Sequence, residues 1–525
     1  MIEQLKRIAK IPLLWVFPIA FGVRFYLCLS TAVINPDGII YIQQARAIYY
    51  QQWGEITACG MKYLSLLPPM IAAAFTVLRD WETAGRFISL LFGTGTLIPL
   101  YFILKRFFDR RTVGLTLLVY AFIPALAERS ADIIRGPIYW FFLASAMLMV
   151  LRHRERRAHA GFDIDLQVAC ILFLVAAWAR IEASFFLILT GAYLLFTERN
   201  RRIRSLSTFL APLALLAAAG LLTALLLNLP LVSLLRLEKP IEVLQGFAAD
   251  YRTLRTSVDA LSQTQEGYLS FFLQQAGDFV WIVPLGPLLD SVMEKFFYPY
   301  VLIFLAGFPG LRQRLGKDPR VAYFVWLCIG AVVMLYLYTL RTFLMYDRFL
   351  INLILPAVFI VGCGCENLMH LLHDRVHLST KRAAAILAAV ILLFGLGKNV
   401  KPRYAEKRIF PRIAAQIVDR KTPGALVRVA AGPSNAYNWV FFYANLDVPG
   451  SLCNRKEAVA IPANYQEFIA GLETEGVCYV LWSAKTWPRE GADLMAAPWA
   501  SDFELLGKWN YDRKDDYLLL RRKAG

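Results

Sequence analysis

Long apolar runs are the feature that most constrains how this chain can fold. A helix that crosses the hydrocarbon core of a bilayer needs about 20 apolar residues, because its backbone polar groups must all be paired within the segment. Eleven such runs occur, at 11–33, 84–104, 112–128, 136–151, 166–180, 183–197, 206–228, 297–311, 320–340, 349–366 and 383–397. Apolar residues make up 58% of the chain, against roughly 45–50% in soluble domains. The pattern predicts a polytopic α-helical membrane protein with about eleven transmembrane helices, and it excludes a soluble enzyme.

The positive charges between the runs predict how the chain is oriented. Cytoplasmic loops carry an excess of Lys and Arg. The alternate short loops hold 7 of these residues, and 22 fall in six other segments, 1–10, 105–111, 152–157, 199–204, 312–320 and 367–382. We therefore predict a multi-pass protein of the cell inner membrane with a cytoplasmic N-terminus and an extracytoplasmic C-terminus. The net charge of +17 is then mainly an orientation signal, and nucleic acid is not expected as a partner.

Two further segments complete the predicted architecture. Residues 63–78 contain Pro68-Pro69. The basic loops that follow stay on the cytoplasmic side only if this segment is a juxtamembrane helix that does not cross the membrane. The tail returns to scattered charges and short apolar runs, which predict helices at 406–420 and 464–475 and strands at 426–431, 477–482 and 517–520. We therefore expect a transmembrane domain over 1–398 and an extracytoplasmic α/β domain over 399–525.

Cysteines give little direct evidence of function. Cys363 and Cys365 have no partner at metal-ligand spacing, so a zinc site is not expected. Cys453 and Cys478 lie in the predicted extracytoplasmic tail, where a disulfide is permitted. The two could pair with each other, which would leave Cys59 over, or remain separate.

Two carboxylates stand out on the predicted outer face. Asp37 lies in Asn35-Pro36-Asp37-Gly38, directly after the first span, and it is either the N-cap of the helix that follows or a base held at the membrane surface. Asp132 lies in a tight turn between two spans, with Arg129 and Arg135 on either side. Charge so close to hydrocarbon is usually paired or functional, so a structural ion cluster and a functional site both remain open.

Other charged residues fall at the same face. They are Lys62, the turn with Arg180 and Glu182, and the turn with Arg341, Asp347 and Arg348. Each has a simple structural explanation, because such residues also flank span ends or snorkel to the interface. All five histidines fall on the predicted cytoplasmic side, so acid–base chemistry outside depends on carboxylates. Taken together, the carboxylates and cations suit a reaction with an anionic lipid.

In the order of several short motifs, the chain resembles the GT-C superfamily of integral-membrane glycosyltransferases. Within it, the chain is similar to the bacterial relatives of protein O-mannosyltransferases and of the lipid A aminoarabinose transferase. The matching features are Pro36-Asp37 with Tyr41, Pro68-Pro69, the sequence 84–87 heading a span, Asp132 in its turn, and Asp347-Arg348 before a late span. O-mannosyltransferases carry Asp-Glu in the first loop, whereas Gly38 follows Asp37 here, and this departure puts a protein acceptor in doubt.

The resemblance implies inverting transfer of a sugar from a polyprenyl-phosphate donor to an acceptor lipid, glycan or protein. A phosphate leaving group needs no general acid, so one carboxylate base near the acceptor suffices. Asp37 is the expected base, with Asp132 orienting the acceptor or an arginine. The cations expected at the donor phosphate are Lys62, Arg129, Arg135, Arg180 and Arg341. Contact with the acceptor or support of the site is expected from Tyr41, Glu182, Asp347 and Arg348. No cofactor and no metal are expected, because no compact set of metal ligands is evident, although members of the family differ in metal dependence.

Two other classes remain open. A lipid or sugar transporter, including a flippase, would also need many spans and scattered polar residues, although no inverted repeat is evident in the sequence. An oligosaccharide ligase would share the topology and the lipid-linked donor. The sequence does not identify the sugar, the acceptor or the length of the prenyl chain.

Overall fold

A computed structural model describes most of the chain, in two compact units. The described residues are 11–58, 61, 63–156, 163–198, 201–226, 238–431, 434–453, 465–474, 476–483, 502–512 and 515–523. The bundle unit comprises Met1–Gly22, Phe92–Glu128 and Gly136–Asn399. The tail unit comprises Val23–Leu91, Arg129–Arg135 and Val400–Gly525. Three helices begin in one unit and end in the other, namely α2 (Pro12–Ser30), α5 (Trp81–Gly95) and α8 (Pro124–Ala131).

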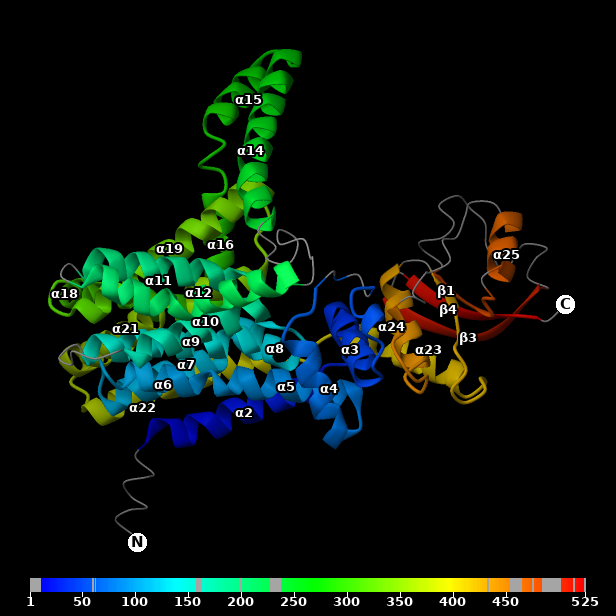
Figure 1. Ribbon diagram of the computed structural model, residues 1–525, viewed down its shortest axis with the longest axis horizontal. Helices are drawn as coiled ribbons and strands as arrows, with labels where there is room; N and C mark the ends of the chain where they lie inside the picture. Colours follow the sequence, from blue (N-terminus) through cyan, green and yellow to red (C-terminus); the bar gives the residue numbers. More distant parts are fainter. Residues whose placement is uncertain are drawn as a thin grey trace, which may run out of the picture. The chain divides into compact units, whose positions relative to one another are not determined.

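The bundle unit consists of helices packed side by side (Figure 1). Its helices are α6 (Leu97–Leu104), α7 (Arg110–Phe122), α9 (Gly136–Glu155), α10 (Ile164–Ala179), α11 (Glu182–Thr197), α12 (Arg202–Leu226), α16 (Leu285–Phe296), α17 (Tyr298–Ala306), α18 (Phe308–Leu315), α19 (Pro319–Thr342), α20 (Asp347–Ile354), α21 (Val358–Val376) and α22 (Thr380–Asn399). Phe173 and Phe186 are fully buried between helices, whereas Ile188, Leu215 and Leu393 are 65–72% exposed. Large apolar side chains on the outside of a bundle are what a lipid-facing surface requires.

The described helices support a multi-pass membrane protein. Five are long and apolar enough to cross a bilayer, and the total rises to eight if three bent helix pairs each count as one span. The bends are 55° between α7 and α8, 99° between α16 and the α17–α18 pair, and 65° between α20 and α21. Pro124 and Pro356 lie at two of the breaks, where a missing N–H interrupts the helix. The figure of eleven spans stays a prediction.

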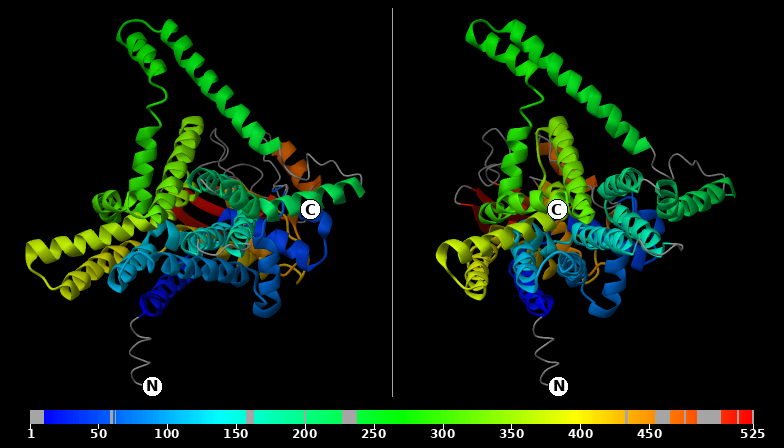
Figure 2. Two further views of the ribbon diagram at one scale, coloured as in Figure 1. Left: turned by 60° about the vertical axis from the view of Figure 1, so that its left-hand side comes forward. Right: turned by 90° about the vertical axis from the view of Figure 1, so that its left-hand side faces the viewer.

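Two further helices form a hairpin in the bundle unit. α14 (Glu238–Thr264) and α15 (Tyr268–Asp278) pack against each other and project from the rest of the unit (Figure 2), with α14 also contacting α19. Gly267 has φ of 69° and makes the turn, a conformation that side chains with a Cβ disfavour. The predicted outer segment 229–296 is therefore helical in its described part.

The tail unit combines helices with a four-stranded sheet. The strands are β1 (Val429–Ala431), β2 (Tyr479–Ser483), β3 (Phe503–Asp512) and β4 (Asp515–Arg522), in the order β1-β2-β4-β3. β1 is parallel to β2, and the other two pairings are antiparallel. Leu472 is buried together with the sheet residues Val480 and Leu520 in one apolar cluster. The helices are α3 (Pro36–Tyr49), η1 (Trp53–Glu55), α4 (Leu67–Leu78), η2 (Ala405–Arg408), α23 (Ile409–Val418), α24 (Ser434–Ala444) and α25 (Tyr465–Thr474). This architecture confirms the predicted C-terminal α/β fold.

The first loop packs against the tail residues within this unit. Trp439 Nε1 donates to the carbonyl oxygen of Ile34 at 2.8 Å, and the N–H of Ile34 donates to the hydroxyl of Tyr443 at 3.2 Å. Gln43 Oε1 accepts from the N–H of Leu452 at 3.0 Å. These contacts join α3 to α24 and the loop that follows it. The domain boundary between residues 398 and 399 stays a prediction.

α4, which covers most of the segment predicted to be juxtamembrane, has 12 residues. A helix of this length is only about 18 Å long.

Candidate active site

The first turn of α3 carries the carboxylate that the sequence predicts as the base. The helix begins at Pro36, and its N-cap is Asn35, with ψ of 151°. Asp37 therefore lies inside the first turn, and the interpretation that Asp37 caps the helix is wrong. Its side chain is exposed and forms no hydrogen bond or ion pair with the described part of the chain. Such a carboxylate is open to an incoming proton donor.

Asn35 ties the start of α3 to the 129–135 segment. Its Nδ2 donates to the carbonyl oxygen of Ile133 at 3.3 Å, and its Oδ1 accepts from the N–H of Ile133 at 2.9 Å. Asn35 is 6% exposed, so both bonds are shielded from water. The pair fixes the helix that carries Asp37 beside the segment that holds Asp132 and Arg135.

Gly38 is required by this close approach. A Cβ at position 38 would lie 2.9 Å from Asn35 Oδ1 and 3.0 Å from the Cβ of Ile133. Gly85 meets the same neighbour, because a Cβ there would lie 2.9 Å from the side chain of Ile133. The Asp-Gly sequence, which departs from the Asp-Glu pattern, therefore has a packing reason in this chain.

Asp132 is a buried carboxylate with an arginine partner that the sequence analysis did not find. Arg403 donates from Nη1 to Oδ1 at 3.0 Å and from Nη2 to Oδ2 at 3.2 Å. Arg129 lies farther away, with Nη1 3.5 Å from Oδ2. The side chain of Asp132 is 1% exposed. Both carboxylate oxygens are thus occupied by a two-point contact, which suits a residue that holds its neighbours in place.

Arg135 lies against an aromatic side chain of α3, and no described carboxylate neutralises its guanidinium. It lies 5.8 Å from the ring centroid of Tyr41 and 5.0 Å from that of Tyr63. It is half-buried and forms no ion pair or hydrogen bond with the residues that the structure describes. Aromatic faces hold a guanidinium without neutralising its charge, so Arg135 can accept a phosphate. Lys62 lies outside the described residues.

In the bundle unit, Arg180 and Glu182 form an ion pair at the start of α11. The guanidinium also lies 6.0 Å from the ring centroid of Tyr139 and 5.5 Å from that of Phe349. The three elements α9, α11 and α20 therefore meet at this arginine. Its side chain is 10% exposed.

A second group of charges in the bundle unit surrounds the end of α19 and the start of α20. Arg341 Nε lies 2.7 Å from Asp250 Oδ2 on α14. Lys295 Nζ lies 3.3 Å from Asp347 Oδ1. Arg348 is exposed and lies 5.2 Å from the ring centroid of Phe349. Lys295 was missed because it falls in the segment 229–296, where no motif marked it.

Comparison with solved structures decides the fold. ArnT from Cupriavidus metallidurans, bound to undecaprenyl phosphate, is 13% identical, with a TM-score of 0.57 over 97% of this chain and 97% of that chain. The Archaeoglobus fulgidus oligosaccharyltransferase, tethered to an acceptor peptide, is 12% identical, with a TM-score of 0.55 over 90% of this chain and 69% of that chain. The chain has the GT-C fold. No protein-family model and no curated protein sequence matches it.

The GT-C fold confirms the predicted fold class, a polytopic helical protein with a small C-terminal sheet domain. The match to ArnT runs over nearly the whole of both chains, whereas the motifs that carry the sequence resemblance are clearest in the first 200 residues. The GT-C fold therefore extends through the tail, where no motif could be matched. Identities of 12–13% establish the fold alone.

Metal ligands are not clustered in the described part of the chain. No group of three or more His, Cys, Asp or Glu residues there is arranged to hold a metal ion. Another structure of the Archaeoglobus oligosaccharyltransferase contains zinc and sulfate, at 12% identity and a TM-score of 0.54. Metal-independent transfer stays a prediction for this chain.

The two tail cysteines, Cys453 and Cys478, are not in the same state. Cys478 is free and exposed, whereas Cys453 is disulfide-bonded. A bond between Cys453 and Cys478 is therefore not formed. The partner of Cys453 lies outside the described residues.

Proposed function

We propose that this protein is an inverting glycosyltransferase that moves a sugar from a polyprenyl-phosphate donor to an acceptor lipid, glycan or protein outside the membrane. The observation that carries the proposal is the arrangement at α3. Asp37 offers an exposed carboxylate and Arg135 a guanidinium, neither with an ion-pair partner among the described residues, and Asn35 and Ile133 join the two segments that carry them. The reaction needs one base and one phosphate-binding cation, and the GT-C fold is the fold of enzymes that use lipid-linked donors.

Asp37 acts as the base in the proposed reaction. An acceptor O–H or N–H attacks the anomeric carbon of the donor sugar from the face opposite the phosphate, and the bond from that carbon to the phosphate oxygen breaks. The bonding electrons leave with the phosphate, and the acceptor proton passes to the Asp37 carboxylate. General base catalysis typically contributes 10²–10⁴-fold.

Arg135 is the first candidate to bind the departing phosphate, because no carboxylate of the described chain competes for it. Arg129 and Lys62 are proposed to act with it. Arg180 and Arg341 are proposed as further phosphate ligands, which would require each to exchange its present carboxylate partner for the phosphate. Cations placed where negative charge develops lower the barrier to its departure.

Asp132 is proposed as a positioning residue. Its bidentate contact with Arg403 orients the segment that carries Ile133 and Arg135. Tyr41 is proposed to hold Arg135 through its ring. Glu182, Asp347 and Arg348 are proposed to support the acceptor. We also propose that the N-terminus lies in the cytoplasm and that the site lies on the outer side of the inner membrane.

Reconstitution tests the function. Purified protein in liposomes is given a polyprenyl-phosphate sugar labelled in the sugar, together with a cell-envelope extract as the source of acceptors. The proposal predicts that label becomes covalently attached to an acceptor and that EDTA leaves the rate unchanged. Movement of the labelled lipid between leaflets without a new bond would indicate a transporter. Transfer only from a diphosphate-linked oligosaccharide would indicate a ligase.

A further inference from the structure

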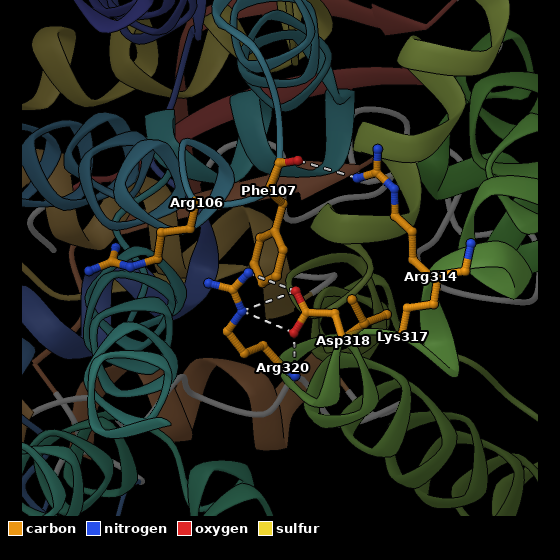
Figure 3. Close-up of a pocket in the computed structure, with 7 residues that line it drawn as sticks. Arg106, Phe107, Arg314, Lys317, Asp318 and Arg320 are labelled. Carbon is orange, nitrogen blue, oxygen red and sulfur yellow. Dashed lines mark hydrogen bonds and ion pairs between the residues drawn. The ribbon is translucent and has the colours of Figure 1, made fainter. Parts of the chain in front are cut away.

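Two pockets open side by side at the end of the bundle unit that the charge pattern places in the cytoplasm. The first has a volume of about 240 Å³ and is lined by Arg106, Arg314, Lys317 and Arg320 (Figure 3). The second, of about 500 Å³, is lined by Lys105, Arg106, Arg152 and Arg156. Arg106 lines both, so the two are adjacent, and we call them the paired basic pockets. Neither contains a residue of the candidate active site.

The arginines of the paired basic pockets already have carboxylate partners. Glu155 lies 2.8 Å from Arg106 and 3.0 Å from Arg320, and Asp318 lies 2.7 Å from Arg320. Two more carboxylates approach from outside the lining: Glu366 lies 2.6 Å from Arg314, and Asp165 lies 3.4 Å from Arg152 and 3.2 Å from Arg156. Among the described residues, seven cations thus face four carboxylates, which leaves a surplus of three positive charges.

Two lysines account for most of this surplus. Lys105 lies in the second pocket and Lys317 in the first, and both are exposed. Neither ammonium group forms an ion pair or hydrogen bond with the described residues. Each pocket therefore offers one unsatisfied ammonium group beside arginines whose positions are fixed by ion pairs. This arrangement has room for two separate phosphate groups.

Apolar surface continues directly from the pockets. The Lys105 ammonium lies 4.2 Å from the ring centroid of Phe102, which also lines the second pocket. Phe102 is 37% exposed, and Ile98, one helical turn earlier on α6, is 38% exposed. A ligand bound at Lys105 therefore meets apolar helix surface on one side and cations on the other. A soluble anion has no use for that apolar surface, whereas a phospholipid places acyl chains on it.

We propose that the paired basic pockets bind the headgroup of an anionic phospholipid with two phosphates, of the diphosphatidylglycerol class. One phosphate binds at Lys105 and the other at Lys317, with Arg106 between them, and the acyl chains run along the surface that carries Phe102 and Ile98. Binding here does not depend on the proposed transfer reaction, because no residue of either pocket takes part in it.

Lipid titration followed by native mass spectrometry tests the proposal on the full chain in detergent. Diphosphatidylglycerol is compared with phosphatidylglycerol, zwitterionic phosphatidylethanolamine and inorganic phosphate. We expect diphosphatidylglycerol to bind most tightly and phosphatidylethanolamine and inorganic phosphate not to compete. Equal binding of phosphatidylethanolamine, or displacement by millimolar inorganic phosphate, would overturn the lipid site. Equal affinity for phosphatidylglycerol would overturn the two-phosphate arrangement.

Matched variants separate a built site from general attraction to positive charge. Lys105→Gln with Lys317→Gln should weaken binding of diphosphatidylglycerol by roughly 30-fold, because each lysine near an anionic headgroup contributes about fivefold. Replacing both with Arg should retain binding. The control, Arg312→Gln with Lys381→Gln, removes two exposed cations from the same predicted side but outside the pockets. An equal loss in that control would show that the lipid is held by general attraction to positive charge, and it would overturn the site.

Discussion

Arg403 binds both oxygens of the buried Asp132 carboxylate, at 3.0 and 3.2 Å, across 271 residues of sequence. Both residues belong to the tail unit. The contact holds the short segment between α8 and α9 against the start of the tail. Because Ile133 in that segment is bonded to Asn35, the same contact determines where α3 presents Asp37.

Breaking the Asp132–Arg403 pair should destabilise the tail unit. Arg403→Gln leaves a carboxylate that is 1% exposed without its main partner, and removing one member of a buried pair typically costs about 3–5 kcal/mol. Thermal unfolding in detergent measures the loss. The double variant Asp132→Asn with Arg403→Gln should recover part of it, because no buried charge is then left unpaired. A single variant as stable as the wild type would show that the pair does not organise the segment.

Gly38→Ala should be destabilising even though alanine favours helices by about 1 kcal/mol over glycine. The new Cβ would lie 2.9 Å from Asn35 Oδ1, so the reciprocal bonds to Ile133 must shift. Gly54→Ala is the matched control, since nothing lies within 4 Å of a Cβ there. Thermal unfolding should separate the two variants. If Gly38→Ala is as stable as Gly54→Ala, the close contact at α3 is not a constraint.

Arg135→Gln should weaken use of the donor without unfolding the protein. We expect KM for the polyprenyl-phosphate sugar to rise by about tenfold or more, because a hydrogen bond to a charged group contributes roughly 1.5–3 kcal/mol. Arg412→Gln, on an exposed position of α23, is the control and should leave KM unchanged. An unaltered KM for Arg135→Gln would remove this residue from the donor site.

Asp447 should contribute stability that disappears in acid. Partial burial raises the pKa of this carboxyl, but hydrogen bonds from Lys421 and the N–H of Gly424 outweigh burial and bring the pKa below 3.8. Its contribution is therefore present above the unfolded pKa and is lost as pH falls through the lower folded value. The group is 40% exposed, so the effect should stay below about 1 kcal/mol.

Melting temperatures of the wild type and Asp447→Asn between pH 7 and pH 3 test this dependence. Their difference should be largest at neutral pH and shrink toward pH 3. Asp419→Asn removes an exposed charge from the same unit and serves as the control. A difference that grows in acid would contradict the assignment.

Much of the fold follows from sequence because periodicity and charge report on local environment. The predicted strand at 477–482 and helix at 464–475 lie within two residues of β2 and α25 at each end. β3 (Phe503–Asp512) was missed because Gly507 and several polar residues interrupt its apolar pattern. α24 was missed because its aromatic residues pack against α3 and give no clear helical stripe.

The candidate site was only partly accessible from sequence. Residue type and position were enough to select Asp37, Asp132 and Arg135. The sequence could not assign the cap to Asn35, because Asn and Asp are both common caps and lie two residues apart here. Arg403 carries no local signal at all, since its role depends on a contact made 271 residues away.

Sugar transfer by the Asp37→Asn variant tests whether Asp37 is the base. Since Asn35 is the N-cap and Asp37 occupies the first turn, the substitution removes only a favourable helix-end charge, which is about 0.3–1 kcal/mol of stability. Glu406→Gln removes an exposed carboxylate from the first turn of η2 and is the matched control. Sugar transfer is measured in liposomes under single-turnover conditions with saturating donor. We predict that Asp37→Asn stays folded and loses 10²–10⁴-fold in rate, whereas Glu406→Gln keeps wild-type turnover. Near-normal transfer by a folded Asp37→Asn variant would contradict the assignment of Asp37 as the base.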